Sequence, residues 1–205
     1  AQLVMALKPL HDAATLKRVI VTTFQSVSGT GKDAMDELMD QTKAILSFQD
    51  VEKNVYKEQI AFNCIVNWEA DPETGFTEEE TKIIEETRKI LNLPGLAITA
   101  TTIRVPVFRS HGESVNIELG KKLTPNEARA ILSTMPGVIV FDDPARGIYP
   151  TSFEVAGQDD VYVGRIREDR SVPNGLHLWV VGDNLRKGAA LNAVQIAEGL
   201  ATRCE

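Results

Sequence analysis

Residues 102–118 read TIRVPVFRSHGESVNIE, and this stretch decides the fold that the sequence predicts. Val, Ile and Thr gather on both sides of a short polar connection, a pattern typical of two β-strands. We therefore expect a hairpin in which Arg104 interrupts the first strand and His111 lies beside Gly112 in the connection. A guanidinium can bind a carboxylate and an imidazole can move a proton, so the hairpin is a candidate site.

The two strands of this hairpin carry different signals. Pro106 cannot donate to a sheet ladder, so its segment needs a sheet edge or a bulge. In the second strand apolar and polar residues alternate, which predicts one buried face formed by Val115, Ile117 and Leu119. The hairpin is therefore expected to have one side in the core.

Working outward, hydrophobic periodicity and turn residues divide the rest of the chain into helices and strands. Helices are predicted over 2–14, 33–48, from the capping box at 77–80, over 124–135 and over 185–201. Strands are predicted over 18–24, 60–66, 137–143, 161–169 and 175–184. The fold class is therefore α+β, a mixed β-sheet covered by helices, and residues 1–205 fit one domain.

Composition excludes several classes of function. The net charge of −7 argues against a nucleic-acid surface, which needs clustered Lys and Arg. No apolar run approaches the roughly 20 residues of a membrane span. Cys64 and Cys204 are far apart without metal-ligand spacing, and Cys64 is expected as an inert residue of the strand 60–66. We expect a reducing, cytoplasmic setting.

A glycine-rich turn, QSVSGTG, joins the strand 18–24 to the following helix. Free backbone N–H groups at such a helix start suit an anion, whereas the alternative is an ordinary glycine turn. A P-loop is excluded, since Ser26 replaces the first glycine and Asp33 follows Lys32 where Ser or Thr is required.

Two other polar features have ordinary structural explanations when residue patterns alone are considered. Glu79 and Lys82 are three residues apart on a helix, so periodicity indicates a solvated ion pair. His177 alternates with Leu176 and Leu178, so it is expected on a sheet face rather than in catalysis.

Five segments taken together resemble the C-terminal part of the aspartate-β-semialdehyde dehydrogenase family. They are TTFQSVSGTG (22–31), EEETKIIEETRKIL (78–91), RVPVFRSHGESVNIE (104–118), VGRIRED (163–169) and VVGDNLRKGAALNAVQIAE (180–198). Members of this family reduce L-aspartyl 4-phosphate to L-aspartate 4-semialdehyde with NADPH and release phosphate. The reaction serves lysine, threonine, methionine and diaminopimelate biosynthesis. The implied fold is the C-terminal domain of a glyceraldehyde-3-phosphate dehydrogenase-like protein.

The resemblance implies roles for residues at matching positions. His111 corresponds to the catalytic acid/base, and Gln25 to the glutamine that places the substrate and the covalent intermediate. Arg104 corresponds to the arginine that holds the substrate carboxylate. Glu79 and Lys82 correspond to a pair in the substrate and phosphate pocket, which replaces the solvated-pair interpretation. The implied cofactor contacts are Ser28, Gly29 and Asn184.

Two parts of the family pattern are missing from this sequence. It holds no GxGxxG-like fingerprint for NADP. The family's nucleophilic cysteine precedes a helix like the one beginning AQLVMALKPLHDA, so we expect that cysteine upstream of Ala1. We therefore expect the 205-residue chain alone to be inactive, the helix at 184–201 to pack against the missing dinucleotide-binding domain, and the domain to form a homodimer.

Two alternatives remain open at this point. The chain could be a non-catalytic dimerisation module or a split-gene remnant, because only absences separate that hypothesis from a truncated enzyme. N-acetyl-glutamyl-phosphate reductase shares the chemistry and architecture, but the segments RVPVFRSH and DNLRKGAALNAVQIAE are closer to the aspartate enzyme.

Overall fold

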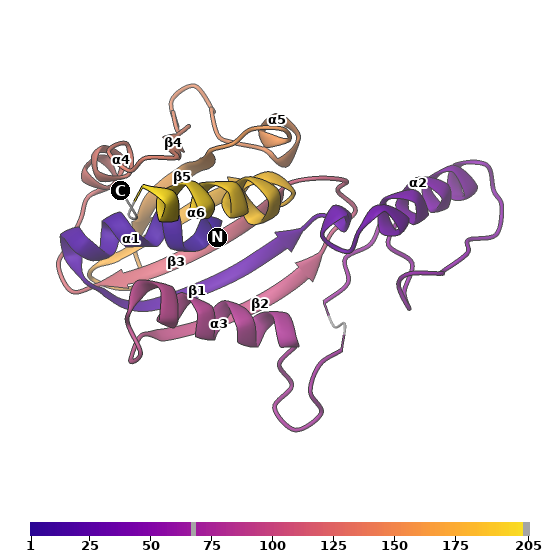
Figure 1. Cartoon of the computed structure of the whole chain (residues 1–205), viewed down its shortest axis with the longest axis horizontal. Coiled ribbons are helices and arrows are strands. Elements are labelled where there is room, and N and C mark those ends of the chain that lie inside the picture. The colour runs from indigo at the N-terminus through magenta and orange to yellow at the C-terminus, as the bar shows by residue number, and fades with distance from the viewer. Residues whose placement is uncertain (67–68, 203–205) are drawn as a thin grey trace.

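A six-stranded mixed sheet organises the chain, as the sequence predicts (Figure 1). The computed structural model describes residues 1–66 and 69–202. The strand order is β2-β1-β3-β6-β5-β4, with β1 parallel to β2, β4 parallel to β5 and the other neighbours antiparallel. The strands are β1 (Leu16–Gln25), β2 (Ala97–Arg104), β3 (His111–Leu119), β4 (Val138–Val140), β5 (Val161–Asp169) and β6 (Gly175–Gly182).

One face of this sheet packs against three helices and forms the main core. These helices are α1 (Gln2–Ala14), α3 (Glu78–Leu91) and α4 (Pro125–Leu132). The predicted inward residues Val115, Ile117 and Leu119 are all buried in this core. Each fully buried aliphatic side chain contributes about 1.5–3 kcal/mol to folding. The alternation read from the sequence therefore identified the correct face of β3.

The predicted hairpin at 102–118 is wrong in its pairing. Both of its strands exist, but β1 lies between them, parallel to β2 and antiparallel to β3. Residues 105–110 therefore cross the end of β1 instead of closing a turn. Their backbone groups bond to the end of β1 and to the segment after it: Val105 N donates to Gln25 O, while Val107 O and Phe108 O accept from Val27 N and Ser28 N. Pro106 follows the end of the edge strand β2.

The predicted strand at 60–66 is also wrong, because its backbone pairs with a helix side chain. Helix α2 (Lys32–Leu46) carries Gln41, whose Oε1 accepts the N–H groups of Ile60 and Ala61 at 2.9 and 3.1 Å. Only Ile65 makes an isolated bridge, to Arg104. Cys64, expected inside the strand, is exposed, and Cys204 lies outside the described residues.

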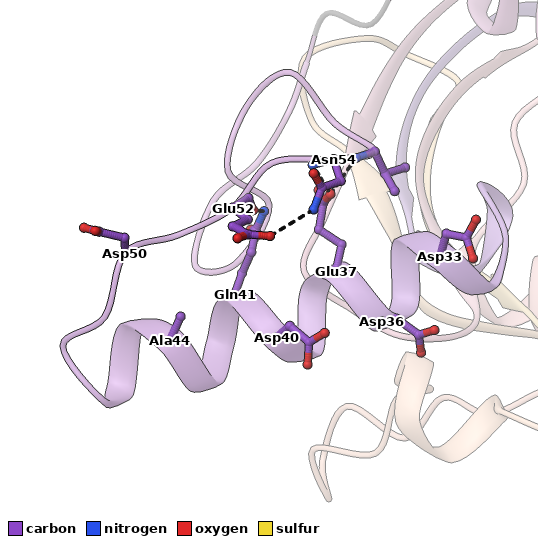
Figure 2. Close-up of a pocket in the computed structure, with 10 residues that line it drawn as sticks. Asp33, Asp36, Glu37, Asp40, Gln41, Ala44, Asp50, Glu52 and Asn54 are labelled. Carbon is purple, nitrogen blue, oxygen red and sulfur yellow. Dashed lines mark hydrogen bonds between the residues drawn. The ribbon is translucent and has the colours of Figure 1, made fainter.

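A second side chain of α2, the acidic Glu37, holds the neighbouring loop (Figure 2). Glu37 is buried, and its carboxylate accepts the N–H groups of Asn54, Val55 and Tyr56. Glu37 and Gln41 are four residues apart and so share one face of α2. Together they fix a stretch without regular structure against the helix, which projects away from the sheet in Figure 1.

Helix starts agree with the capping signals in the sequence. Thr77 with Glu80, and Thr124 with Glu127, form capping boxes at α3 and α4. A third capping box begins the short α5 (Ser152–Val155). The predicted C-terminal helix exists as a π-helical turn, η2 (Arg186–Ala190), followed by α6 (Leu191–Ala201). None of their side chains is buried, and the packing of this helix on another domain stays a prediction.

Among the described residues, no helix combines the length and apolar character that crossing a bilayer requires.

Candidate active site

The ends of three strands place the predicted site residues together. Gln25 is the last residue of β1, and Arg104, its register partner, is the last of β2. His111 is the first residue of β3, which runs antiparallel to β1, so it lies at the same edge. The crossing segment 105–110 carries the chain from Arg104 over β1 to His111. The sheet topology thus brings these side chains to one edge.

A cavity of about 500 Å³ opens at this edge. Seven of the eight predicted site residues line it: Gln25, Ser28, Gly29, Glu79, Lys82, His111 and Asn184. The N-terminal residues Ala1 and Gln2 also line it. The predicted site residues in the lining come from four separate parts of the sequence, and Ala1 and Gln2 come from a fifth.

Arg104 lies behind Gly29 rather than in the lining itself. It is buried, and its Nη1 donates to Ser26 O at 2.8 Å. A Cβ built on Gly29 would come to 3.0 Å from Arg104 Nη1 and 3.3 Å from His111 Nε2. Burial lowers the pKa of the guanidinium from its ordinary value, although a group of this basicity stays charged. The side chains of Arg104 and His111 therefore both lie directly against Gly29.

Glu79 and Lys82 form the expected i, i+3 pair, with 3.1 Å between Lys82 Nζ and Glu79 Oε2. Glu79 also accepts from Gln25 Nε2 at 3.3 Å through its other oxygen. The Glu79 carboxylate raises the pKa of the half-exposed Lys82 ammonium. The Glu79–Lys82 pair is partly exposed to solvent and also lines the cavity. The solvated ion pair expected from periodicity and the pocket pair implied by the resemblance are therefore compatible.

His111 is held by a polar network on one side of its ring. The backbone N–H of Ser26 donates to His111 Nδ1 at 3.0 Å, and Ser26 Oγ lies 3.0 Å from the same nitrogen. Burial, followed by the charge of Arg104, lowers the pKa of His111 to about 3. The imidazole is therefore neutral at neutral pH.

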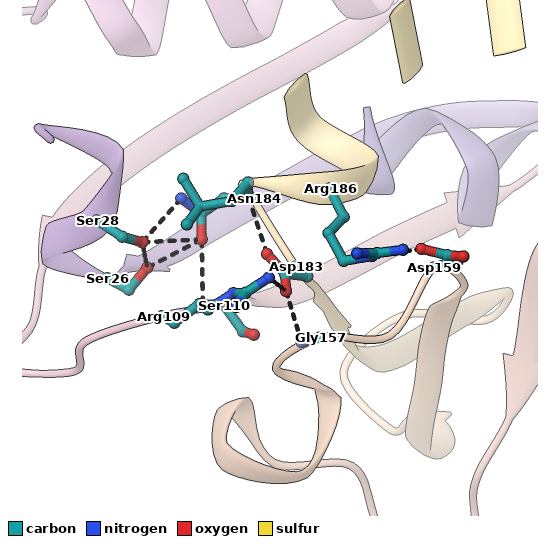
Figure 3. Close-up of polar contacts among 10 residues, drawn as sticks. Ser26, Ser28, Arg109, Ser110, Gly157, Asp159, Asp183, Asn184 and Arg186 are labelled. Atoms are coloured by element: carbon teal, nitrogen blue, oxygen red, sulfur yellow. Dashed lines mark hydrogen bonds and ion pairs between the residues drawn. The ribbon is translucent and has the colours of Figure 1, made fainter. Parts of the chain in front are cut away.

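Asn184 connects this network to the loop after β6 (Figure 3). Its Oδ1 accepts from Ser26 Oγ, Ser28 Oγ and Ser110 N at 3.0 to 3.2 Å. Its neighbour Asp183 is fully buried and pairs with Arg109 at 2.7 Å. These contacts fix the loop that carries Asn184 to the ends of β1 and the crossing segment.

Sequence reasoning missed Glu113 and Thr23, which are register partners on β3 and β1. Both line the cavity and are buried, and neither Glu113 Oε2 nor Thr23 Oγ1 has a hydrogen-bond partner among the described residues. Burial raises the pKa of Glu113 to about 7. The signal was available: the alternation that buries Val115 and Ile117 also places a carboxyl at 113 on the inner face.

His177 lies on a sheet face as predicted, half-exposed and 3.3 Å from Asn116 Nδ2. It is absent from the lining of the cavity. In the described part of the chain, no three His, Cys, Asp or Glu residues are grouped to hold a metal ion.

Comparison with known proteins gives this geometry a family. A family model described as semialdehyde dehydrogenase, dimerisation domain, matches residues 7–187. The chain belongs to this family. The semialdehyde dehydrogenase dimerisation domain thus accounts for the whole sheet and for the strand ends that carry Gln25, Arg104 and His111.

The relatives of this semialdehyde dehydrogenase domain are longer proteins. Aspartate-semialdehyde dehydrogenase of Aquifex aeolicus is 48% identical over 198 residues, which cover 96% of this chain and 58% of that protein. The enzyme of Legionella pneumophila is 50% identical, with 96% and 57% covered. The chain thus spans less than two thirds of these curated relatives.

Solved structures agree with the fold. The crystal structure of aspartate semialdehyde dehydrogenase II from Vibrio cholerae has a TM-score of 0.94 and 44% identity, covering 98% of this chain and 59% of that one. A second structure of that enzyme is described as complexed with ASA. The α+β fold predicted from the sequence is therefore confirmed.

Proposed function

We propose that this chain is the catalytic and dimerisation part of a longer aspartate-semialdehyde dehydrogenase, which reduces L-aspartyl 4-phosphate to L-aspartate 4-semialdehyde with NADPH. The observation that carries the proposal is the single cavity on which Gln25, His111 and the Glu79–Lys82 pair converge. Arg104, which we assign to the substrate carboxylate, lies directly behind Gly29 in the wall of this cavity. Such a site suits a small, doubly anionic substrate. Its product serves lysine, threonine, methionine and diaminopimelate biosynthesis.

Each side chain has a chemical task in this proposal. A thiolate from the preceding part of the protein adds to the acyl carbon, and phosphate departs with the electrons of the broken C–O bond. Arg104 pairs with the α-carboxylate, since its planar fork matches two carboxylate oxygens. Lys82 neutralises the phosphate, Gln25 orients the reacting carbonyl through its amide, and His111 is the group that holds or gives a proton.

Residues near Asn184 fit a nicotinamide. Ser28, Gly29, Asn184, Leu185 and Gly188 all line the cavity, and none of them carries a charge. Small or neutral side chains suit the flat ring and its carboxamide, which needs hydrogen-bond partners rather than ions. When bound, NADPH supplies the hydride that reduces the acyl group. In this proposal the chain contacts the nicotinamide ring and holds the substrate beside it.

The test is phosphate-dependent reduction of NADP with aspartate semialdehyde, measured for the 205-residue chain and for the full-length protein that contains it. We expect turnover only from the longer protein, because the chain alone lacks the nucleophile and the dinucleotide fingerprint. Turnover by the 205-residue chain would overturn the assignment of a nucleophile outside it. Faster turnover with N-acetyl-glutamate semialdehyde would identify the other reductase, and no turnover with either would favour a non-catalytic module.

The second sheet face supports a homodimer. Ile20, Thr22 and Phe24 on β1 and Trp179 on β6 are half-exposed there, and the Phe24 and Trp179 rings meet edge to face at 5.6 Å. Half-buried aromatic and β-branched side chains on one face are typical of a surface that pairs with a second copy. We place the two-fold interface on this face.

Sedimentation velocity at micromolar concentration tests the interface. We expect a dimer, and we expect Thr22→Lys to shift it to monomer, because the substitution places an ammonium group on the proposed interface of each copy, where dimerisation would bury it. Lys43→Glu, at an exposed site on α2, is the control and should stay dimeric. A stable monomer of the unmodified protein would contradict the proposal.

A further inference from the structure

The imidazole of His111 is locked on its Nδ1 side by Ser26. A backbone N–H can only donate, and Ser26 N lies 3.0 Å from His111 Nδ1 in hydrogen-bonding geometry. Nδ1 therefore carries a lone pair, and a neutral imidazole must then carry its proton on Nε2. Nε2 lies on the side of the ring next to Gly29, where both residues line the cavity. The network thus selects one of the two tautomers.

Asn184 anchors Ser26 through its side-chain amide. A separate contact, with the backbone of Ser110, fixes the orientation of this amide. Ser110 N–H donates to Asn184 Oδ1 at 3.0 Å, so this atom is the carbonyl oxygen and the other is the nitrogen. Asn184 Nδ2 then donates to Ser28 Oγ at 3.0 Å, while Ser26 Oγ donates to Oδ1 at 3.1 Å (Figure 3). Every partner of the amide is a donor or acceptor of the required kind.

The backbone next to His111 is held in an unusual conformation. Ser110 is fully buried and has a φ of +72°, in the left-handed region that non-glycine residues rarely adopt. Such a conformation costs about 1 kcal/mol or more and persists where surrounding contacts impose it. The Asn184 carbonyl is the contact that receives the Ser110 N–H. Asn184 therefore ties together the residue after β1, the η1 turn (Val27–Gly29) and the residue before β3.

We propose that Asn184 and Ser26 are positioning residues for His111, which they hold as the neutral tautomer with Nε2–H directed at the reacting oxygen of the substrate. This inference rests on the proposed function and deepens it. When the thiolate adds to the acyl carbon, a C–S bond forms and the carbonyl π electrons move to oxygen. The Nε2–H group donates a hydrogen bond to that oxygen, and the carbonyl re-forms as phosphate leaves. In this addition and release of phosphate the ring neither gains nor loses a proton.

The electrostatic surroundings agree with a neutral donor. Burial and the nearby Arg104 guanidinium both disfavour the imidazolium, and Asp183 only partly opposes them. A preorganised donor aimed at a developing oxyanion contributes about 3–4 kcal/mol in enzymes where one has been removed. The family resemblance implies a cofactor contact for Asn184, and its contacts within the chain add a positioning task.

The tautomer is measured directly by two-dimensional ¹⁵N–¹H correlation of the histidine side chains in the 205-residue chain. Only three histidines are present, so His11→Gln and His177→Gln assign the signals. His11 is an internal reference, because its Nδ1 accepts from Leu16 N–H at 3.2 Å. We expect His111 to show an unprotonated Nδ1 and a protonated Nε2, and Asn184→Ala to mix the tautomers. Ser26→Ala keeps the backbone N–H that donates to Nδ1 and should retain more of the Nε2–H tautomer. A protonated Nδ1 in the unmodified chain, or an unchanged tautomer in Asn184→Ala, would overturn the proposal.

Kinetics of the full-length protein separate positioning from cofactor binding. In Asn184→Ala we expect kcat to fall about 10- to 100-fold with a much smaller change in KM for NADP, because the reacting groups are misplaced by less than an ångström. Asn184→Asp keeps the acceptor oxygen for Ser110 and should recover part of this loss. Asn126→Ala, on α4, is the control. A raised KM for NADP with unchanged kcat would overturn the positioning role. If the full-length protein has no turnover at all, the proposed function fails, and the tautomer measurement still decides how His111 is held.

Discussion

Gln25 and Arg104 are register partners at the ends of the parallel strands β1 and β2. The ends of parallel strands meet at one edge of a sheet, so the two side chains face the same edge, where β3 begins with His111. Arg104 Nη1 then reaches across to Ser26 O, one residue beyond Gln25. The guanidinium is thereby fixed before any substrate arrives.

Replacing this fixed guanidinium should impair substrate binding. In Arg104→Lys, the point charge of an ammonium cannot both bond Ser26 O and pair with two carboxylate oxygens. We expect kcat/KM for aspartate semialdehyde in the full-length protein to fall about 10- to 100-fold, mainly through KM, since a charge-assisted hydrogen bond contributes about 1.5–3 kcal/mol. Arg88→Lys is the matched control, because Arg88 also donates to a backbone carbonyl, that of Leu96, away from the cavity. Equal losses in both variants would contradict the role of Arg104.

The depressed pKa of His111 should appear in the pH dependence of stability. Its pKa is about 3 in the folded chain against 6.5 as the ordinary value, so the unfolded state binds more protons between these limits. Stability contributed by the neutral ring is present above pH 6.5 and is lost as pH falls towards 3. The charged groups facing the ring are Arg104, Asp183 and the Ala1 amine. The difference in unfolding free energy between the 205-residue chain and His111→Gln, measured in urea, should fall by about 1–2 kcal/mol between pH 6.5 and 5, because all other groups are common to both proteins.

Glu113 should produce the opposite slope. Burial raises its pKa from 4.5 to about 7, so the folded state binds more protons in that window. The stability contributed by the neutral Glu113 carboxyl is fully present below pH 4.5 and is lost as the pH rises through 7. Glu113→Gln should therefore gain stability relative to the unmodified chain as the pH increases from 5 to 7.5 in the same urea measurement. Parallel curves for the two proteins would show that Glu113 ionises normally.

Most of the sheet could be predicted because its strands follow local rules. The alternation in β3 and the capping boxes at Thr77 and Thr124 depend only on neighbouring residues, and all are present. The hairpin failed because pairing depends on a strand 80 residues earlier, β1, which inserts between β2 and β3. The strand at 60–66 failed because Gln41 supplies the acceptor that a neighbouring strand would otherwise give.

The candidate site shows the same division. Family resemblance, rather than residue pattern, selected Gln25, Glu79 and Lys82, whose contact depends on the folded chain. The role of Asn184 could not be read from sequence, since its partners Ser26, Ser28 and Ser110 lie 74 to 158 residues away. Glu113 could have been found, because alternation with Val115 predicts its inward position.

Gln41 should be essential for the irregular loop beside α2. It is buried, its Oε1 accepts two buried N–H groups, and its Nε2 donates to Glu52 O. Gln41→Met keeps the length of the side chain but leaves these groups without partners, which should cost about 2–4 kcal/mol. Amide hydrogen exchange should accelerate at Ile60 and Ala61 more than in β1. Lys43→Met, on the exposed face of α2, is the control and should change stability by less than about 0.5 kcal/mol.

Two explanations account for a glycine at position 29: contact with the cofactor, or the close approach of Arg104 and His111. The variant Gly29→Ala separates them. An added Cβ would lie 3.0 Å from Arg104 Nη1 and 3.3 Å from His111 Nε2, and both groups are held by Ser26. Gly29→Ala should therefore displace them by a few tenths of an ångström, lowering kcat/KM for aspartate semialdehyde about tenfold or more. Its φ is not in the left-handed region, so the free energy of unfolding should change by less than about 1 kcal/mol.

Gly95→Ala is the control for this variant. A Cβ at position 95 meets nothing within 4 Å, so the substitution should leave activity unchanged. If Gly29→Ala raises only the KM for NADP, the glycine serves the cofactor; a loss in kcat and in semialdehyde binding shows that it makes room for the two side chains.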